Sequence, residues 1–148
     1  MGNGVRNLGI IVVVFAVAAM AMGIAFVQQG FAKEAFLVNA TRQEQITVQG
    51  VEGIIDTAAE AQLAGDVVRE HRHGIAPTYG DLLEGKQFDP TNPKQLSYAQ
   101  ALNLENYLYL AVASFGIFTV VKASGAFMIV MGLALGVTGY GLIRIARR

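Results

Sequence analysis

The apolar stretch from Tyr107 to Ile143 constrains this chain most, because it is too long for a single membrane crossing. It carries one charge, Lys122. As a helix it would extend roughly 55 Å, whereas the hydrocarbon core of a bilayer is about 30 Å thick. Part of the stretch must therefore be covered by protein instead of lipid.

A first apolar stretch, from Leu8 to Ala32, contains no charged residue. Its helical length of about 37 Å slightly exceeds one transmembrane span. Arg6 precedes it, as in a signal peptide, but the stretch is about twice as long as a signal-peptide core and no clean small-x-small cleavage site follows. We therefore expect a retained membrane anchor.

The charged residues are distributed unevenly. All 11 acidic residues lie between Glu34 and Glu105. The spans are flanked by arginines without acidic neighbours, namely Arg6 before the first and Arg144, Arg147 and Arg148 after the second. By the positive-inside rule, both termini are expected in the cytoplasm and the acidic segment on the outer side of the inner (cytoplasmic) membrane. An acidic exposed segment also disfavours nucleic-acid binding.

Lys122 places the second span. If its side chain reaches the outer interface, the span covers Ala123 to Ile143, about 31 Å, with Tyr140 and Arg144 as anchors at the inner interface. The apolar residues before Lys122 then form a stem above the membrane that contacts protein through Tyr107, Leu108, Phe115 and Phe118. A three-span alternative would turn at Lys122–Gly125, but it needs a first crossing of only about 22 Å and would export the basic tail.

The predicted fold class is an all-α membrane protein with two antiparallel transmembrane helices, an extracytoplasmic helical insert, and a second helix that extends above the membrane. Its segments are a cytoplasmic N-terminus (1–7), a transmembrane helix (8–31), an acidic extracytoplasmic helical domain (32–106), an apolar helical stem (107–122), a second transmembrane helix (123–143) and a cytoplasmic basic tail (144–148).

Weaker signals divide the acidic segment. Gln45 to Gln49 alternates polar and apolar residues, which predicts a short strand or an extended linker. An alanine-rich helix is expected over Val51 to His73, and a turn or short helix over Thr78 to Leu83. Thr91 or Asn92 can cap a helix that starts at Pro93. That helix is expected to reach Arg144, either unbroken or bent at Ser124–Gly125.

Small residues recur on one face of each apolar helix. In the second helix they are Gly125, Gly132, Gly136 and Gly139, and in the first Gly9, Ala16, Ala19 and Gly23. Small residues let helix backbones approach closely in lipid, although glycine and alanine are also simply common in membrane helices. The spacing favours helix packing and leaves open whether the contact lies within one chain or between chains.

His71-Arg72-His73 is the one motif that suggests a metal. Helical zinc ligands are usually four residues apart, whereas a spacing of two places these imidazoles on different faces, and Arg72 repels a cation. The chain also has no cysteine. We therefore expect a solvated helix end, with no metal and no cofactor.

Several short motifs occur in a recognisable order. They are Ile46-Thr-Val, Ala61-Gln, Thr78-Tyr-Gly-Asp-Leu, Asp89-Pro, Ala101-Leu-Asn and Ala113-Ser-Phe-Gly, followed by the glycine-rich span. This order resembles a group of small bacterial two-span membrane proteins, many of which carry the name aromatic ring-opening dioxygenase. The resemblance implies a two-span architecture without an established activity. A non-haem iron dioxygenase needs two histidines and a carboxylate in facial geometry, which His71 and His73 do not offer.

Catalytic motifs are absent and packing surfaces abundant. We therefore expect a structural or accessory membrane protein without catalysis of its own, in contact with the lipid bilayer and with other membrane chains as a small subunit or a homo-oligomer. The alternative is a membrane-anchored sensor or ligand-binding module, and a membrane-bound metalloenzyme comes third. A pocket in the middle domain lined by converging polar groups would favour the binding module.

Overall fold

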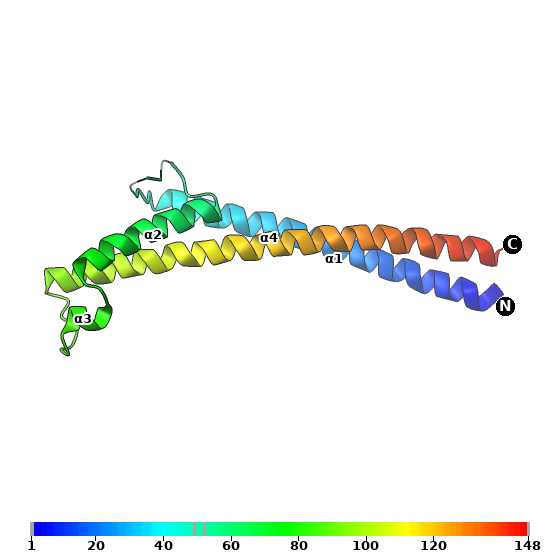
Figure 1. The fold of residues 1–148 in the computed structure, drawn as a ribbon. Coiled ribbons are helices and arrows are strands. Elements are labelled where there is room, and N and C mark those ends of the chain that lie inside the picture. The colour runs from blue at the N-terminus through cyan, green and yellow to red at the C-terminus, as the bar shows by residue number, and fades with distance from the viewer. Residues whose placement is uncertain (1, 49, 52, 148) are drawn as a thin grey trace. The chain divides into compact units, whose positions relative to one another are not determined.

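The structure is a computed structural model that describes residues 2–48, 50–51 and 53–147. Four helices follow one another, α1 (Gly2–Gln43), α2 (Ala58–Ile75), α3 (Tyr79–Leu83) and α4 (Pro93–Ala146) (Figure 1). These described residues are 83% helical and form no strand. The predicted all-helical class is therefore confirmed, whereas Arg148 of the predicted basic tail lies outside the described residues.

Both apolar helices are longer than a membrane crossing requires. Helix α1 continues past the expected end at Phe31 to Gln43, because no glycine or proline interrupts residues 31–43. Helix α4 is unbroken, so the bend at Ser124–Gly125 and the three-span turn at Lys122–Gly125 are both wrong. Its start matches the prediction, with Asn92 Oδ1 accepting hydrogen bonds from the backbone N–H groups of Lys94 and Gln95.

Each long helix is apolar enough to cross a membrane, by length and composition. Only 11% of the residues in the most apolar window of either helix are buried. A core helix of a soluble protein would be mostly covered, whereas both of these windows are mostly exposed.

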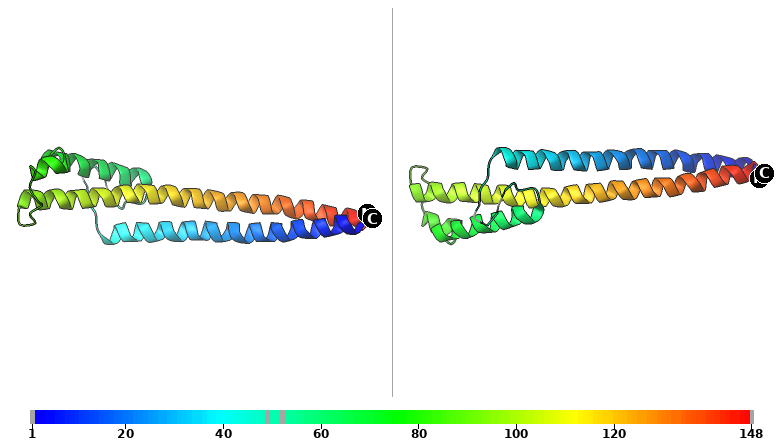
Figure 2. Two further views of the ribbon diagram at one scale, coloured as in Figure 1. Left: turned by 90° about the horizontal axis from the view of Figure 1, so that it is seen from below. Right: turned by 90° about the horizontal axis from the view of Figure 1, so that it is seen from above.

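The chain divides into two compact units, each of which contains part of both long helices. The two-helix unit consists of residues 2–33 and 117–147, and the four-helix unit consists of residues 34–116. The first stretches of α1 and the last stretches of α4 run side by side in both views of Figure 2.

Every buried residue of the two-helix unit is glycine or alanine. These residues repeat every seven positions on both helices, and they are Gly9, Ala16, Gly23 and Gly30 of α1 and Gly125, Gly132 and Gly139 of α4. A repeat of seven keeps the same face of a helix turned towards its neighbour over several turns. Larger side chains such as Met20 and Ile143 lie beside these small residues and are only partly buried.

The two backbones touch at these small residues. A Cβ built on Gly23 would lie 2.6 Å from the carbonyl oxygen of Gly125, and one built on Gly9 would lie 2.9 Å from that of Gly139. At Gly132 the corresponding neighbour is the carbonyl oxygen of Ala16, also at 2.9 Å. Even a methyl group would clash with backbone at these positions, and the structure places the contacts within one chain.

The four-helix unit contains the remaining elements. The predicted helix from Val51 begins later, at Ala58, because Thr57 forms the cap. The Thr57 hydroxyl accepts from the Glu60 backbone N–H at 3.2 Å, and the Glu60 carboxylate accepts from the Thr57 N–H at 3.1 Å. This reciprocal capping box ends the linker. The linker holds an isolated Val48–Val51 bridge in place of a strand, and Gln49 lies outside the described residues.

Two hydrogen bonds at the Glu60 carboxylate set its acidity. The backbone N–H of Asp56, and after it hydrogen bonding to Thr57, holds the pKa of Glu60 below its ordinary value. A lowered folded-state pKa means that this stabilisation is present above the unfolded-state pKa. It is lost as the pH falls through the folded-state pKa.

Candidate functional site

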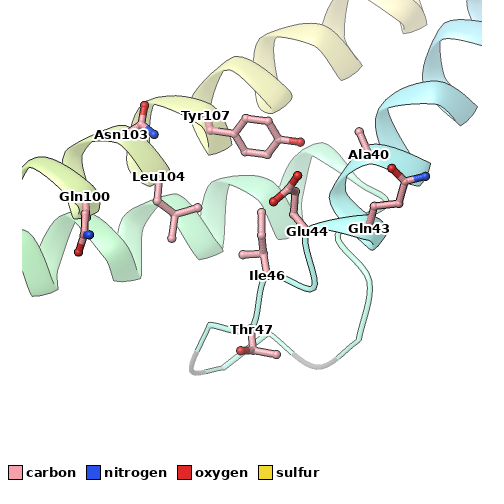
Figure 3. Close-up of a pocket in the computed structure, with 9 residues that line it drawn as sticks. All are labelled: Ala40, Gln43, Glu44, Ile46, Thr47, Gln100, Asn103, Leu104 and Tyr107. Atoms are coloured by element: carbon pink, nitrogen blue, oxygen red, sulfur yellow. The ribbon is translucent and has the colours of Figure 1, made fainter.

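A groove lies in the four-helix unit between the end of α1, the loop that follows it, and α4. Its volume is about 710 Å³, within the range of small-molecule sites. Figure 3 shows its nine lining residues, which are Ala40, Gln43, Glu44, Ile46, Thr47, Gln100, Asn103, Leu104 and Tyr107.

Helical spacing and a loop turn build the groove. Gln100, Asn103, Leu104 and Tyr107 are three or four residues apart, so they share one face of α4. After α1 the chain turns at Gln45, whose φ of 48° is left-handed.

Thr41 ties this turn back to the linker. Its hydroxyl lies 3.0 Å from the carbonyl oxygen of Ile55 and 2.8 Å from that of Val38. Both Thr41 and Ile55 are buried. The loop wall of the groove is therefore attached to the core of the unit at both of its ends.

The described lining of the groove is mostly polar. Six of its side chains are polar, and no hydrogen bond within the described part of the chain engages them, namely Gln43, Glu44, Thr47, Gln100, Asn103 and Tyr107. Among the described lining residues there is no histidine, lysine, arginine or serine, and Glu44 is the single carboxylate.

A buried ion pair joins α2 to α4 elsewhere in this unit. Arg72 Nε donates to Glu105 Oε2 at 2.6 Å, and an Nη of Arg72 donates to the hydroxyl of Tyr98. The guanidinium also lies over the Tyr98 ring, 5.0 Å from its centroid. All three side chains are buried, and the Glu105 carboxylate raises the pKa of Arg72 further above its usual range.

The ion pair corrects the sequence interpretation of His71-Arg72-His73. The two histidines are exposed as expected, but Arg72 is only 8% exposed, so the prediction of a wholly solvated helix end is wrong. A further Nη of Arg72 lies 3.1 Å from His73 Nε2. Among the described residues, no group of three or more His, Cys, Asp or Glu side chains could hold a metal.

The Arg72–Glu105 ion pair could have been identified from helical spacing, because each residue lies on the buried face of its helix. The buried face of α2 runs through Ala61, Ala64, Gly65 and Val68, and four residues after Val68 the same face reaches Arg72. On α4, Glu105 follows the buried Tyr98 by seven residues. Opposite charges in phase with two apolar faces indicate a buried pair.

A second polar contact supports the same packing of α2 on α4. The Tyr109 hydroxyl donates to Asp66 Oδ1 at 2.7 Å, and a Cβ built on Gly65 would lie 3.1 Å from the Tyr109 ring. Burial, and secondly the bond to Asp66, raise the pKa of Tyr109. Gly65, which weakens the helix by propensity, provides the space for this ring.

The other predicted residues take different positions. Ala19 and Gly136 are half-buried and lie outside the seven-residue repeat, and the nearest neighbour of a Cβ on Gly136 is the Ala16 Cβ at 3.8 Å. Gly30 was not among the predicted residues but belongs to the repeat. It faces the Phe118 carbonyl oxygen and the aliphatic part of the Lys122 side chain.

The predicted stem is covered on one side only. Leu108 and Phe115 are buried, Phe118 is half-buried and Tyr107 lines the groove, whereas Leu110 is 67% exposed. The three predicted anchors also differ. Lys122 Nζ lies 4.8 Å from the centroid of the Phe31 ring, whereas Tyr140 and Arg144 are exposed.

Comparisons with protein-family models, with curated proteins and with solved structures found no match for this chain.

Proposed function

We propose that this protein is an accessory subunit of the cytoplasmic membrane, in which two antiparallel transmembrane helices carry the four-helix unit on the outer side. The observation that carries the proposal is the composition of the two-helix contact, in which only glycine and alanine are buried. Lipid provides no hydrophobic driving force between helices, so close backbone packing with large apolar residues turned outward suits a bilayer.

The register of the small residues supports the antiparallel arrangement. Gly9 meets Gly139, Ala16 meets Gly132 and Gly23 meets Gly125, so the residue number falls along α4 as it rises along α1. A Cβ on Gly2 would also lie 3.3 Å from the carbonyl oxygen of Ala146.

Charged residues limit the membrane-embedded part. Arg144 at one end and Lys122 at the other enclose Ala123 to Ile143, a helical length of about 31 Å that fits the hydrocarbon core. Exposed aromatic Tyr140 lies where an inner interfacial belt is expected. Ile117 and Val120 of the same unit are exposed on the other side of Lys122. Apolar surface beyond the lipid favours contact with another membrane protein chain.

The topology predicts where added cysteines are accessible. The natural chain has none, so Lys86→Cys and Arg147→Cys introduce single thiols. In intact cells, a membrane-impermeant maleimide should label the first and leave the second unlabelled until the membrane is permeabilised. Labelling of Arg147→Cys from outside would contradict the two-span arrangement.

The accessory role predicts partners. Protein extracted in mild detergent should retain either further copies of itself or other membrane subunits in native mass spectrometry. Ile117→Ser/Val120→Ser should release these partners, because it replaces exposed apolar side chains by polar ones. Phe127→Ser, on the proposed lipid-facing surface, serves as the control. A monomer without partners at every detergent concentration would contradict the accessory role.

The groove favours a second candidate function. A groove of about 710 Å³ lined by several polar side chains is typical of a binding module, whereas a purely structural subunit does not need one. A membrane-anchored protein that captures a small ligand on the outer side is therefore the alternative.

A further inference from the structure

The charge of the groove limits the ligands that it can accept. Glu44 is the only acidic or basic side chain among the described lining residues, and neither of the two described ion pairs involves it. The segment from Glu34 to Glu105 contains every acidic residue of the chain. The negative charge of these acidic residues attracts cations and repels anions.

Beside this carboxylate the groove offers an aromatic and aliphatic surface. Figure 3 shows the Glu44 carboxylate and the Tyr107 ring directed into the same space, with Leu104 of α4 and Ile46 of the loop also lining the groove. Carboxylate and aromatic face together are suited to an organic cation, because the ring quadrupole also attracts positive charge. Leu104 and Ile46 can cover an apolar body.

The described lining also includes the amide side chains of Gln43, Gln100 and Asn103, whose carbonyl oxygens are hydrogen-bond acceptors. A bare metal ion is a poor fit, because Ca²⁺ takes six to eight oxygen ligands and usually several carboxylates, whereas the described lining has one.

We propose that the groove binds a small organic amine, protonated at neutral pH, whose ammonium group pairs with Glu44 and whose apolar or aromatic body lies on Tyr107, Leu104 and Ile46. This inference rests on the second candidate function and adds its ligand class. It depends on the four-helix unit alone and is independent of the accessory role.

Three probes with the same body and different head groups test this. Phenethylamine, phenylacetate and phenethyl alcohol are titrated calorimetrically into the full-length protein in nanodiscs of zwitterionic lipid, with empty nanodiscs as the blank. The amine should bind saturably. The alcohol should bind at least about tenfold more weakly and the acid should not bind, because each lacks the charge-assisted hydrogen bond.

Two substitutions locate the binding. Glu44→Gln should weaken amine binding by about tenfold or more, and Tyr107→Leu by roughly threefold. Glu70→Gln, which makes the same charge change at an exposed position of α2, should leave it unchanged. Each variant is first checked for an unchanged melting curve, and Ala40→Phe, which fills the groove from α1, provides a second way to block it.

Three outcomes would overturn the proposal, namely no saturable binding of the amine, equal binding of amine and acid, or equal effects of Glu44→Gln and Glu70→Gln. The result is separable from the accessory role. A protein that binds the amine but brings no partners would retain this site and lose only the proposed subunit function. A protein that brings partners but does not bind the amine would retain the proposed subunit function and lose only this site.

Discussion

Leucine at Gly23 is expected to separate α1 from α4 in the two-helix unit and to lower the stability of that unit. A Cβ there would lie 2.6 Å from the Gly125 carbonyl oxygen, which belongs to backbone and cannot rotate away. Overpacking of this kind typically costs about 1–3 kcal/mol and occasionally more. The free energy of unfolding should be measured in mixed detergent micelles.

The same helices provide matched controls. A Cβ on Gly141 would meet nothing within 4 Å, so Gly141→Leu should change the free energy by no more than about 0.5 kcal/mol. Gly136→Leu should fall between the two, because its nearest neighbour is a methyl group at 3.8 Å. Equal losses at Gly23 and Gly141 would show that the glycine contact does not hold the helices together.

Removal of the carboxylate in Glu105→Leu is expected to destabilise the four-helix unit by about 3–5 kcal/mol, because it leaves Arg72 charged and buried. The double variant Arg72→Met/Glu105→Leu should recover most of this loss, since it removes both charges and keeps similar volumes. Hydrogen exchange of α2 and denaturant unfolding followed by circular dichroism can measure both effects.

An exposed cation of the same helix provides the comparison. Arg69 pairs with Asp66 at 2.9 Å, but the two side chains are 48% and 40% exposed. Arg69→Gln should therefore cost less than about 1 kcal/mol. If Glu105→Leu costs no more than Arg69→Gln, or if the double variant is worse than the single one, the pair is not a buried structural contact.

Periodic features could be predicted well from the sequence. Apolar runs without breakers predicted the two long helices, and Asn92-Pro93 predicted the start of α4. The seven-residue spacing of Gly9, Ala16 and Gly23 was also visible, and its next step would have included Gly30. Boundaries were less accurate, as at Thr57, because a capping box depends on local hydrogen bonds that periodicity does not show.

The groove and the ion pair could not be derived in the same way. The groove depends on Gln45, whose left-handed backbone redirects the loop over α4, and on Thr41, which fastens that loop to Ile55. The ion pair joins residues 33 positions apart in the chain. Neither the groove nor the ion pair has a local sequence signature, although the position of Arg72 on the buried face of its helix was a usable clue.

By itself, the sequence determined the helical class, the two long apolar helices and the small-residue faces, because each follows from local propensity or from a repeat along one helix. Tertiary structure decided which partner each face meets. It paired the two glycine lines within one chain, buried Arg72 against Glu105, and brought Glu44 and Tyr107 into one groove. These outcomes depend on the register between distant segments, which is set by close packing and by the need to pair buried charge.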